Sequence, residues 1–413
     1  MGRSICKEER CTACEACVAV CPKNCISRKE DDDGSWILEK DETVCINCGL
    51  CERVCPGVDA PLNGSAIESY AAFRSDHEEH MKSASGGVAS YLYEYALSKG
   101  MYIAGVELTE NFEARFCLTN KKEKIDVFRN SKYTFSFVGT VYKEIITQLK
   151  NRKDVLFVGL PCQVAGIKKL AKAVSNGGNL ITVDLVCHGT PPAKYLQEHI
   201  HSIETKINKK ITTCHFRDAK FDTSNYAYTA YTHNSKEPVY LKYVDQDDNF
   251  QIGYHNALIY RKVCYSCQYA QRNRVGDITI GDYHGLGRLA PYNKERKNLS
   301  CVVVNTDRGK LFLEEASKEG KLVLHRRPVE EPMIGERQFN KPSDAPKERA
   351  VFIREYCAGA GFEKAANRAF KKYKVKNLIQ RTLQIREVKY AIMGMIPRDF
   401  KESIKAIIRK VRG

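Results

Sequence analysis

The 413-residue sequence lacks several patterns that would place it in well-known classes. No stretch reaches the roughly 18 consecutive apolar residues that a membrane-spanning helix needs, and no apolar run precedes Cys6. We therefore expect no signal peptide and a cytoplasmic protein. Zinc-finger, RNP and helix-turn-helix patterns are also missing, so nucleic acid is not an expected partner. No G-x-G-x-x-G motif follows a strand, which removes support for a Rossmann nicotinamide site.

The positive charge of the chain is unevenly spread. The net charge is +16. Residues 1–60 hold 8 basic and 12 acidic residues, a net of −4, whereas residues 365–413 hold 14 basic and 3 acidic residues, a net of +11. The excess therefore belongs mainly to the C-terminal segment. With 43% hydrophobic residues, the chain can bury a sizeable core in two or three domains.

Cysteine is abundant, with 18 residues, and eight of them form an internal duplication. The first copy begins at Cys11 and the second at Cys45, and each has the spacing C-x2-C-x2-C-x3-C-P. This spacing is typical of ferredoxins with two 4Fe-4S clusters, in which the fourth cysteine of each copy binds the other cluster. A zinc site or a disulfide framework is the alternative, but two complete copies favour clusters. The predicted ligand sets are Cys11, Cys14, Cys17 and Cys55 for cluster one, and Cys45, Cys48, Cys51 and Cys21 for cluster two.

Two cysteines near these motifs fall outside the pattern. Cys6 has no predicted role, and Cys25 is expected to pack in a small core. Between the two copies, residues 26–30 and 36–39 are predicted to form a hairpin around a turn at residues 31–34.

The rest of the sequence predicts mixed α/β structure. Short apolar strands are expected at 69–73, 154–158, 180–186, 277–280 and 301–305, with helices at 86–97 and 163–174. Strands alternating with helices favour a partly parallel sheet. The predicted fold is thus an α+β ferredoxin-like N-terminal domain, a mixed α/β flavin-binding core and a helical C-terminal tail. The expected boundaries are 1–60 for the ferredoxin domain, 66–150 and 151–345 for the two parts of the core, and 346–413 for the basic tail.

A second set of cysteines lies in the core. Cys162 and Cys187 each follow a predicted strand, at the edge of the sheet where α/β proteins form ligand crevices, and Cys264-x2-Cys267 adds a pair. Spacing alone leaves three alternatives: a third 4Fe-4S cluster, buried structural thiols, or a redox-active pair.

A cluster of small residues precedes the helix predicted at 86–97. The free N–H groups at a helix N-terminus can bind a phosphate, although serine and glycine also serve as ordinary caps. These residues are Ser83, Ser85, Gly86 and Gly87.

Four segments resemble one known family. They are residues 83–87 (SASGG), 159–163 (GLPCQ), 187–191 (CHGTP) and 276–282 (GDITIGD). In this order they are similar to the beta subunits of coenzyme F420 hydrogenases and dehydrogenases, and the resemblance covers roughly residues 66–335. It implies FAD and a 4Fe-4S cluster held by the second cysteine set. Bacterial members are often found among cell-surface polysaccharide genes.

The resemblance also implies particular site residues. Ser83, Ser85, Gly86, Gly87, Lys132 and Tyr133 would lie near the FAD. Gln163, His188 and Asp282 would approach the isoalloxazine or its substrate. His188 would then either shuttle a proton or stand as a structural histidine beside a cluster ligand.

The expected function is that of an iron–sulfur flavoprotein oxidoreductase. A flavin converts between two-electron and one-electron transfer, so the ferredoxin domain is expected to serve a protein electron partner and the FAD a small organic substrate. One alternative is a reductase of a sugar or lipid-linked intermediate in cell-surface polysaccharide biosynthesis. The other is an electron-transfer subunit without a substrate of its own.

The C-terminal tail carries a separate hypothesis. Phe400, Ile404, Ile407, Ile408 and Val411 recur at helical spacing, with lysines and arginines around them. Such a helix suits peripheral contact with an anionic membrane. It equally suits packing on the core, or docking onto an acidic electron-transfer partner.

Overall fold

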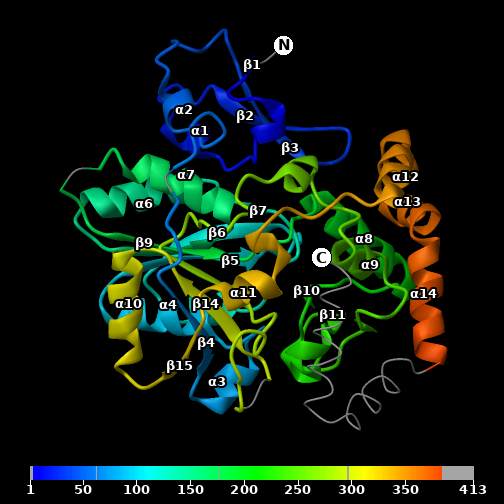
Figure 1. Cartoon of the computed structure of the whole chain (residues 1–413). Coiled ribbons are helices and arrows are strands. Elements are labelled where there is room, and N and C mark those ends of the chain that lie inside the picture. Colours follow the sequence, from blue (N-terminus) through cyan, green and yellow to red (C-terminus); the bar gives the residue numbers. More distant parts are fainter. Residues whose placement is uncertain (1–2, 62, 175, 295–296, 384–413) are drawn as a thin grey trace.

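The computed structural model describes residues 3–61, 63–174, 176–294 and 297–383. Three bodies are visible in Figure 1: a small N-terminal lobe at the top, a central sheet between helices, and a group of helices at one side. The predicted mixed α/β architecture with a helical C-terminal region is therefore present. The predicted segment 384–413 of the tail lies outside the described residues.

The N-terminal lobe is built on the predicted hairpin. β2 (Ile26–Glu30) and β3 (Trp36–Lys40) pair antiparallel, and β1 (Arg3–Ser4) joins the outer side of β3. Two short helices, α1 (Ala16–Val20) and α2 (Leu50–Arg53), begin inside the two cysteine motifs. Glu15 and Gly49 precede these helices in the left-handed conformation, which turns each cysteine loop sharply before its helix.

The core is one nine-stranded mixed sheet with the order β15-β4-β14-β13-β9-β8-β5-β6-β7. Its central neighbours β13, β9, β8 and β5 run parallel. The sheet crosses the expected boundary at residue 150 without interruption, because its strands come from both predicted parts of the core. Its strands are β4 (Glu68–Arg74), β5 (Tyr102–Leu108), β6 (Ala114–Thr119), β7 (Ser136–Phe137), β8 (Val155–Gly159), β9 (Leu180–Leu185), β13 (Ile278–Asp282), β14 (Ser300–Val304) and β15 (Leu322–Arg327).

Helices cover both faces of this sheet. α4 (Val88–Ser98), α5 (Lys124–Phe128) and α10 (Asp307–Ser317) pack on one face, where apolar side chains of β5, β8, β9, β13 and β14 meet them. α6 (Val141–Lys150) and α7 (Pro161–Ala171) pack on the other, together with α1 of the N-terminal lobe. The lobe is therefore seated on the α6–α7 layer (Figure 1). The short helices α3 (His77–Met81) and α11 (Glu330–Gly335) complete the core.

The third body has a hydrophobic core of its own, which was not expected from the sequence. α8 (Ala193–Ile207) and α9 (Asn249–His255) pack with α12 (Lys347–Glu355) and α13 (Phe362–Ala369) against a three-stranded sheet. That sheet contains β10 (Thr213–His215), β11 (Tyr228–Tyr231) and β12 (Tyr240–Lys242). The first helices of the predicted tail are therefore buried parts of the fold, and α14 (Lys371–Thr382) follows them with no buried residue.

Candidate functional site

The predicted ligands of cluster one lie close together within the N-terminal lobe. Burial, followed by the charges of Cys14, Cys11 and Cys55, raises the pKa of Cys17 well above its ordinary value, so the four thiols are mutual neighbours. Cys6 joins them, although the motif excluded it. Its hydrogen bond lowers the pKa of Cys11 to about 6 and that of Cys55 to about 7.

The predicted ligands of cluster two surround a cavity of about 240 Å³ at the outer end of the lobe. Cys21 of the first motif lies there with Cys45, Cys48 and Cys51 of the second, which is the exchange of fourth ligands that the spacing predicts. Cys25 lies 3.4 Å from Cys21, sulfur to sulfur, and also packs in the small core of the lobe.

No disulfide joins these thiols. Within the described part of the chain, no three His, Cys, Asp or Glu side chains converge on a position for a single metal ion. The grouping of Cys21 with Cys45, Cys48 and Cys51 fits a 4Fe-4S cluster, in which four thiolates are distributed over several irons.

The second set of cysteines also converges. Cys162 lies in the first turn of α7, Cys187 follows β9, and Cys264 and Cys267 belong to the 3-10 turn Lys262–Ser266 and its end. All four line one small cavity of about 30 Å³ at the carboxyl ends of β8 and β9. Burial and the charges of the other three thiols raise the pKa of Cys187. Four thiols around one enclosed space suit a 4Fe-4S cube.

The predicted ligands of cluster one and the second cysteine set are adjacent. Cys14 and Cys162 belong to the same packed layer and act on each other electrostatically. Gly166 of α7 faces Cys14 and Tyr142, because a Cβ there would stand 2.9 Å from the Tyr142 hydroxyl and 3.3 Å from the Cys14 sulfur. Glu15 fixes the lobe at the same place, since its carboxylate accepts the backbone N–H groups of Val138 (2.6 Å) and Gly139 (3.0 Å).

A larger cavity of about 340 Å³ opens on the other side of Cys187. This volume falls within the range of roughly 300–1,000 Å³ typical of small-molecule sites. Of the residues that the family resemblance implied, eight line this cavity: Ser83, Ser85, Gly87, Lys132, Tyr133, Gln163, His188 and Asp282. Gly86 does not line it. It packs instead against the sheet, where a Cβ would stand 2.1 Å from the carbonyl oxygen of Ala72.

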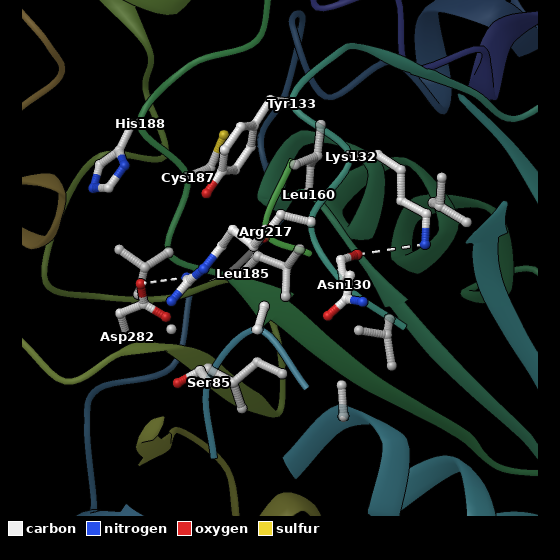
Figure 2. Close-up of a pocket in the computed structure, with 18 of the residues that line it drawn as sticks. Ser85, Asn130, Lys132, Tyr133, Leu160, Leu185, Cys187, His188, Arg217 and Asp282 are labelled. Carbon is white, nitrogen blue, oxygen red and sulfur yellow. Dashed lines mark hydrogen bonds and ion pairs between the residues drawn. The ribbon is translucent and has the colours of Figure 1, made fainter. Parts of the chain in front are cut away.

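Two of the lining residues stabilise the walls of the cavity. Gln163 is fully buried. Its side-chain N–H donates to the Ser136 carbonyl (2.7 Å), and its side-chain oxygen accepts from the Leu160 N–H (3.2 Å). Lys132 donates to the carbonyls of Arg129 (2.6 Å) and Val127 (2.9 Å) at the end of α5, and burial lowers its pKa to about 7. Figure 2 shows the Lys132 side chain extended along the wall to its contact with the Asn130 backbone.

Polar groups of the third body form the facing wall. Arg217 donates to the carboxylate of Asp282 (2.7 Å), and the Tyr226 hydroxyl donates to the same oxygen (3.0 Å). Tyr133 stacks on Tyr254 at 4.0 Å between ring centroids. Arg217, Tyr226 and Tyr254 all line the cavity but were not found by sequence reasoning, because they belong to no motif and lie in separate elements. The Arg217–Asp282 pair ties this body to the sheet (Figure 2).

Three histidines stand at this cavity. His188 and His284 both approach the carboxylate of Glu336, at 3.2 and 3.6 Å. Burial opposes ionisation of Glu336, but the hydrogen bond from His188 and the charge of His284 hold its pKa below its usual value. His255, which sequence reasoning missed, faces the cavity from α9. Desolvation by the cavity walls, followed by the charges of His188 and Arg217, lowers the pKa of His255 to about 4.

The cavity has unsatisfied groups that suit a polar ligand. The side-chain oxygens of Asn130 and Thr134 are buried without a hydrogen-bond partner, and both residues line the cavity. Buried polar atoms of this kind normally have partners, so these two fit a ligand that supplies donors. Gly87 stands beside them as the left-handed N-cap of α4, whose first N–H groups are free.

Known proteins match two parts of the chain. Residues 10–59 match the 4Fe-4S dicluster domain, and residues 152–329 match the C terminus of the coenzyme F420 hydrogenase/dehydrogenase beta subunit. The family predicted from the motifs is confirmed. The chain is therefore an iron–sulfur protein related to subunits of F420 hydrogenases and dehydrogenases.

Individual relatives agree with this assignment. A subunit of the F(420)H(2) dehydrogenase of Methanosarcina mazei is 27% identical over 221 residues, which are 51% of this chain and 63% of that protein. Ferredoxin 7Fe of Hydrogenibacillus schlegelii is 49% identical over 41 residues, 10% of this chain and 46% of that protein. The chain thus spans less than two thirds of the length of these two relatives.

A solved structure also matches most of the chain at low sequence identity. A chain of the F420-reducing [NiFe] hydrogenase complex from Methanosarcina barkeri is 20% identical, covering 79% of this chain and 94% of that one, with a TM-score of 0.40. Among the described residues, no helix is long and apolar enough to cross a bilayer.

Proposed function

We propose that this protein is an iron–sulfur flavoprotein oxidoreductase that exchanges single electrons with a protein partner and a hydride with a small organic molecule. The observation that carries the proposal is a shared wall. The cavity of the second cysteine set and the 340 Å³ cavity are both lined by Leu160 and by residues 187–190. A ligand in the larger cavity would therefore lie next to Cys187, which supplies one thiol of the second cysteine set.

The three cysteine sets form a line toward that cavity. Cys48 of the outer set is exposed, and exposed Val44 and Ile46 flank Cys45 of the same set, which suits exchange with a protein partner. The inner ferredoxin set lies beside the third set, because Cys14 and Cys162 belong to one packed cluster of side chains. Three 4Fe-4S clusters, one in each set, would give one-electron carriers along the whole line.

FAD is the cofactor that this cavity would hold. When bound, it would supply the conversion between one-electron and hydride transfer. Asn130 and Thr134 would donate to or accept from it, and the first N–H groups of α4 would suit its phosphates. Lys132 and Gln163 would keep the surrounding loops in place, because their own hydrogen bonds are made within the protein.

Asp282 and His188 would lie at the substrate end of the cavity. The Asp282 carboxylate is held by Arg217 and Tyr226, and it presents a fixed negative group there. His188 is partly exposed and paired with Glu336, an arrangement that suits a proton donor or acceptor beside the hydride site. The dehydrogenase of Methanosarcina mazei is named for reduced F420. The substrate of this chain is proposed only as a small organic hydride donor or acceptor.

Anaerobic stopped-flow spectroscopy tests the proposal. We expect dithionite to reduce the clusters and then bleach bound flavin, and reduced flavin to be reoxidised by an organic acceptor from a panel that includes deazaflavins and sugar-linked ketones. Reduction of flavin with no response to any organic acceptor would instead favour an electron-transfer subunit without a substrate. Purified protein that holds no flavin under these conditions would contradict the proposal.

A further inference from the structure

Arg261 lies between cluster one and the second cysteine set. It immediately precedes the turn that carries Cys264, and its side chain is buried, with only 3% of the residue exposed. One guanidinium nitrogen donates to the carbonyl of Thr12 (2.9 Å), which lies between two ligands of cluster one. Arg261 thus connects the ferredoxin lobe with the loop of the second set.

Contacts with the core hold the same side chain from other directions. The backbone N–H of Arg261 donates to the Thr190 carbonyl (3.0 Å) and Nε to the Thr190 hydroxyl (3.3 Å), three residues after Cys187. The guanidinium carbon stands 3.6 Å from the centre of the Phe135 ring. Arg261 and Thr12 also line the 30 Å³ cavity between the four cysteines. The position of the guanidinium is therefore fixed on several sides.

The charge of Arg261 has no carboxylate partner among the described residues. Its hydrogen-bond acceptors are a hydroxyl and a carbonyl, both neutral. A buried cation without an opposite charge is costly, so a compensating anion is expected nearby. The groups on which this charge acts are the thiols of Cys11, in cluster one, and Cys162, in the second set. Clusters with thiolate ligands carry the negative charge that this cation requires.

We propose that Arg261 is a positioning residue for electron transfer, which holds the two cysteine sets together and raises the reduction potential of the cluster in each. The proposal rests on the proposed function, because it requires a cluster in the second set. A single electron leaves one cluster, which is oxidised, and enters the other, which is reduced, with no proton transferred. A fixed positive charge beside both clusters stabilises the form with the added electron, and cluster potentials respond to such nearby charge.

Two substitutions separate charge from packing. R261Q keeps hydrogen-bond donors and removes the charge, whereas R261K keeps the charge and loses the planar fork that stacks on Phe135. R349Q is the matched control: Arg349 stacks on Tyr265 at 4.8 Å and donates to the Tyr260 carbonyl (3.0 Å), near the same turn. Redox titration of the whole protein, followed by EPR, gives the potential of each cluster, and iron content shows whether each is retained.

We expect R261Q to retain its iron and to show lower potentials for cluster one and the third cluster, with cluster two unchanged. R261K and R349Q should keep the potentials of the unaltered protein. Unchanged cluster potentials in an R261Q protein that keeps its iron would overturn the role of Arg261 but not the proposed function. If R261Q loses iron, R261K decides between charge and packing. Potentials in R261K equal to those of the unaltered protein would support the role of the charge. Loss of iron from R261K would show that Arg261 contributes only packing. Only two clusters in the unaltered protein would overturn the proposed function as well.

Discussion

The second cysteine set depends on residues far apart in the sequence that meet around one small cavity. Cys264 and Cys267 come from a single turn, so their removal leaves the strands of the sheet intact. We expect C264A/C267A to lose about four irons per chain and to alter the absorption of bound flavin, because that cavity shares a wall with the proposed flavin site. Iron analysis and anaerobic absorption spectra measure both effects.

A buried cysteine outside the set provides the control for this change. Cys214 lies in β10, away from the other thiols, and C214A should keep all of its iron. The EPR signals of the two ferredoxin clusters should survive in both variants. Unchanged iron in C264A/C267A would show that these thiols are structural and would remove the third cluster.

Individual site residues could be predicted from the sequence where they belong to a short local motif. The ferredoxin cysteines are encoded by local spacing, so the sequence alone was sufficient to group them. The SASGG and GLPCQ segments are compact enough to resemble a family. Arg217, Tyr226 and His255 carry no local pattern, because they reach the cavity only through the packing of the third body on the sheet. Cys6 was missed because it stands outside the spaced motif and reaches Cys11 and Cys55 only through the folding of the N-terminal lobe.

Among the elements, the helices of the third body are joined by a buried histidine. His199 of α8 contacts Asp248 (3.0 Å) and Glu363 of α13 (2.6 Å), and only 3% of the residue is exposed. Burial opposes protonation of His199, but these two carboxylates raise its pKa from an ordinary value of 6.5 to about 9. A raised pKa adds stability that is complete below about pH 6.5 and is lost as the pH rises through about 9.

We therefore expect H199Q to lower the melting temperature at neutral pH, with a free-energy cost of at most on the order of 3 kcal/mol. The difference between H199Q and the unaltered protein should shrink between pH 7 and pH 10. H201Q is the control, because His201 lies in the same helix with its side chain exposed. Thermal melts across this pH range measure the effect. A difference that stays constant with pH would contradict a charged His199.

Strands and helices were predictable from the sequence where a short apolar run ends at turn-forming residues. The structure has β8, β9, β13 and β14 within two residues of the strands expected from the sequence, and α4 and α7 likewise overlap the expected helices. The strands β10, β11 and β12 escaped prediction because they are three or four residues long and rich in polar and aromatic side chains. Their pairing depends on α8 and α9, which bury one side of them.

At the scale of the whole molecule, the basic segment at the C-terminus carries the proposal of peripheral membrane contact. Residues 398–413 lie outside the described part of the structure, so the proposal rests on the sequence pattern. We expect their deletion to abolish binding to anionic vesicles at low salt, because each surface-near Lys or Arg contributes roughly 1 kcal/mol. Vesicle co-sedimentation measures this binding, with neutral vesicles and the variant K401Q/K405Q as controls. Lost solubility or lost flavin on deletion would show that the segment belongs to the folded protein.

The central claim is that one chain holds three clusters in line with a flavin. The most direct test is the iron, sulfide and flavin content of anaerobically purified, reconstituted protein. We predict about twelve irons, about twelve sulfides and about one FAD per chain. About eight irons without flavin would contradict the line of carriers proposed here, and about four irons or stoichiometric zinc would contradict the ferredoxin assignment itself.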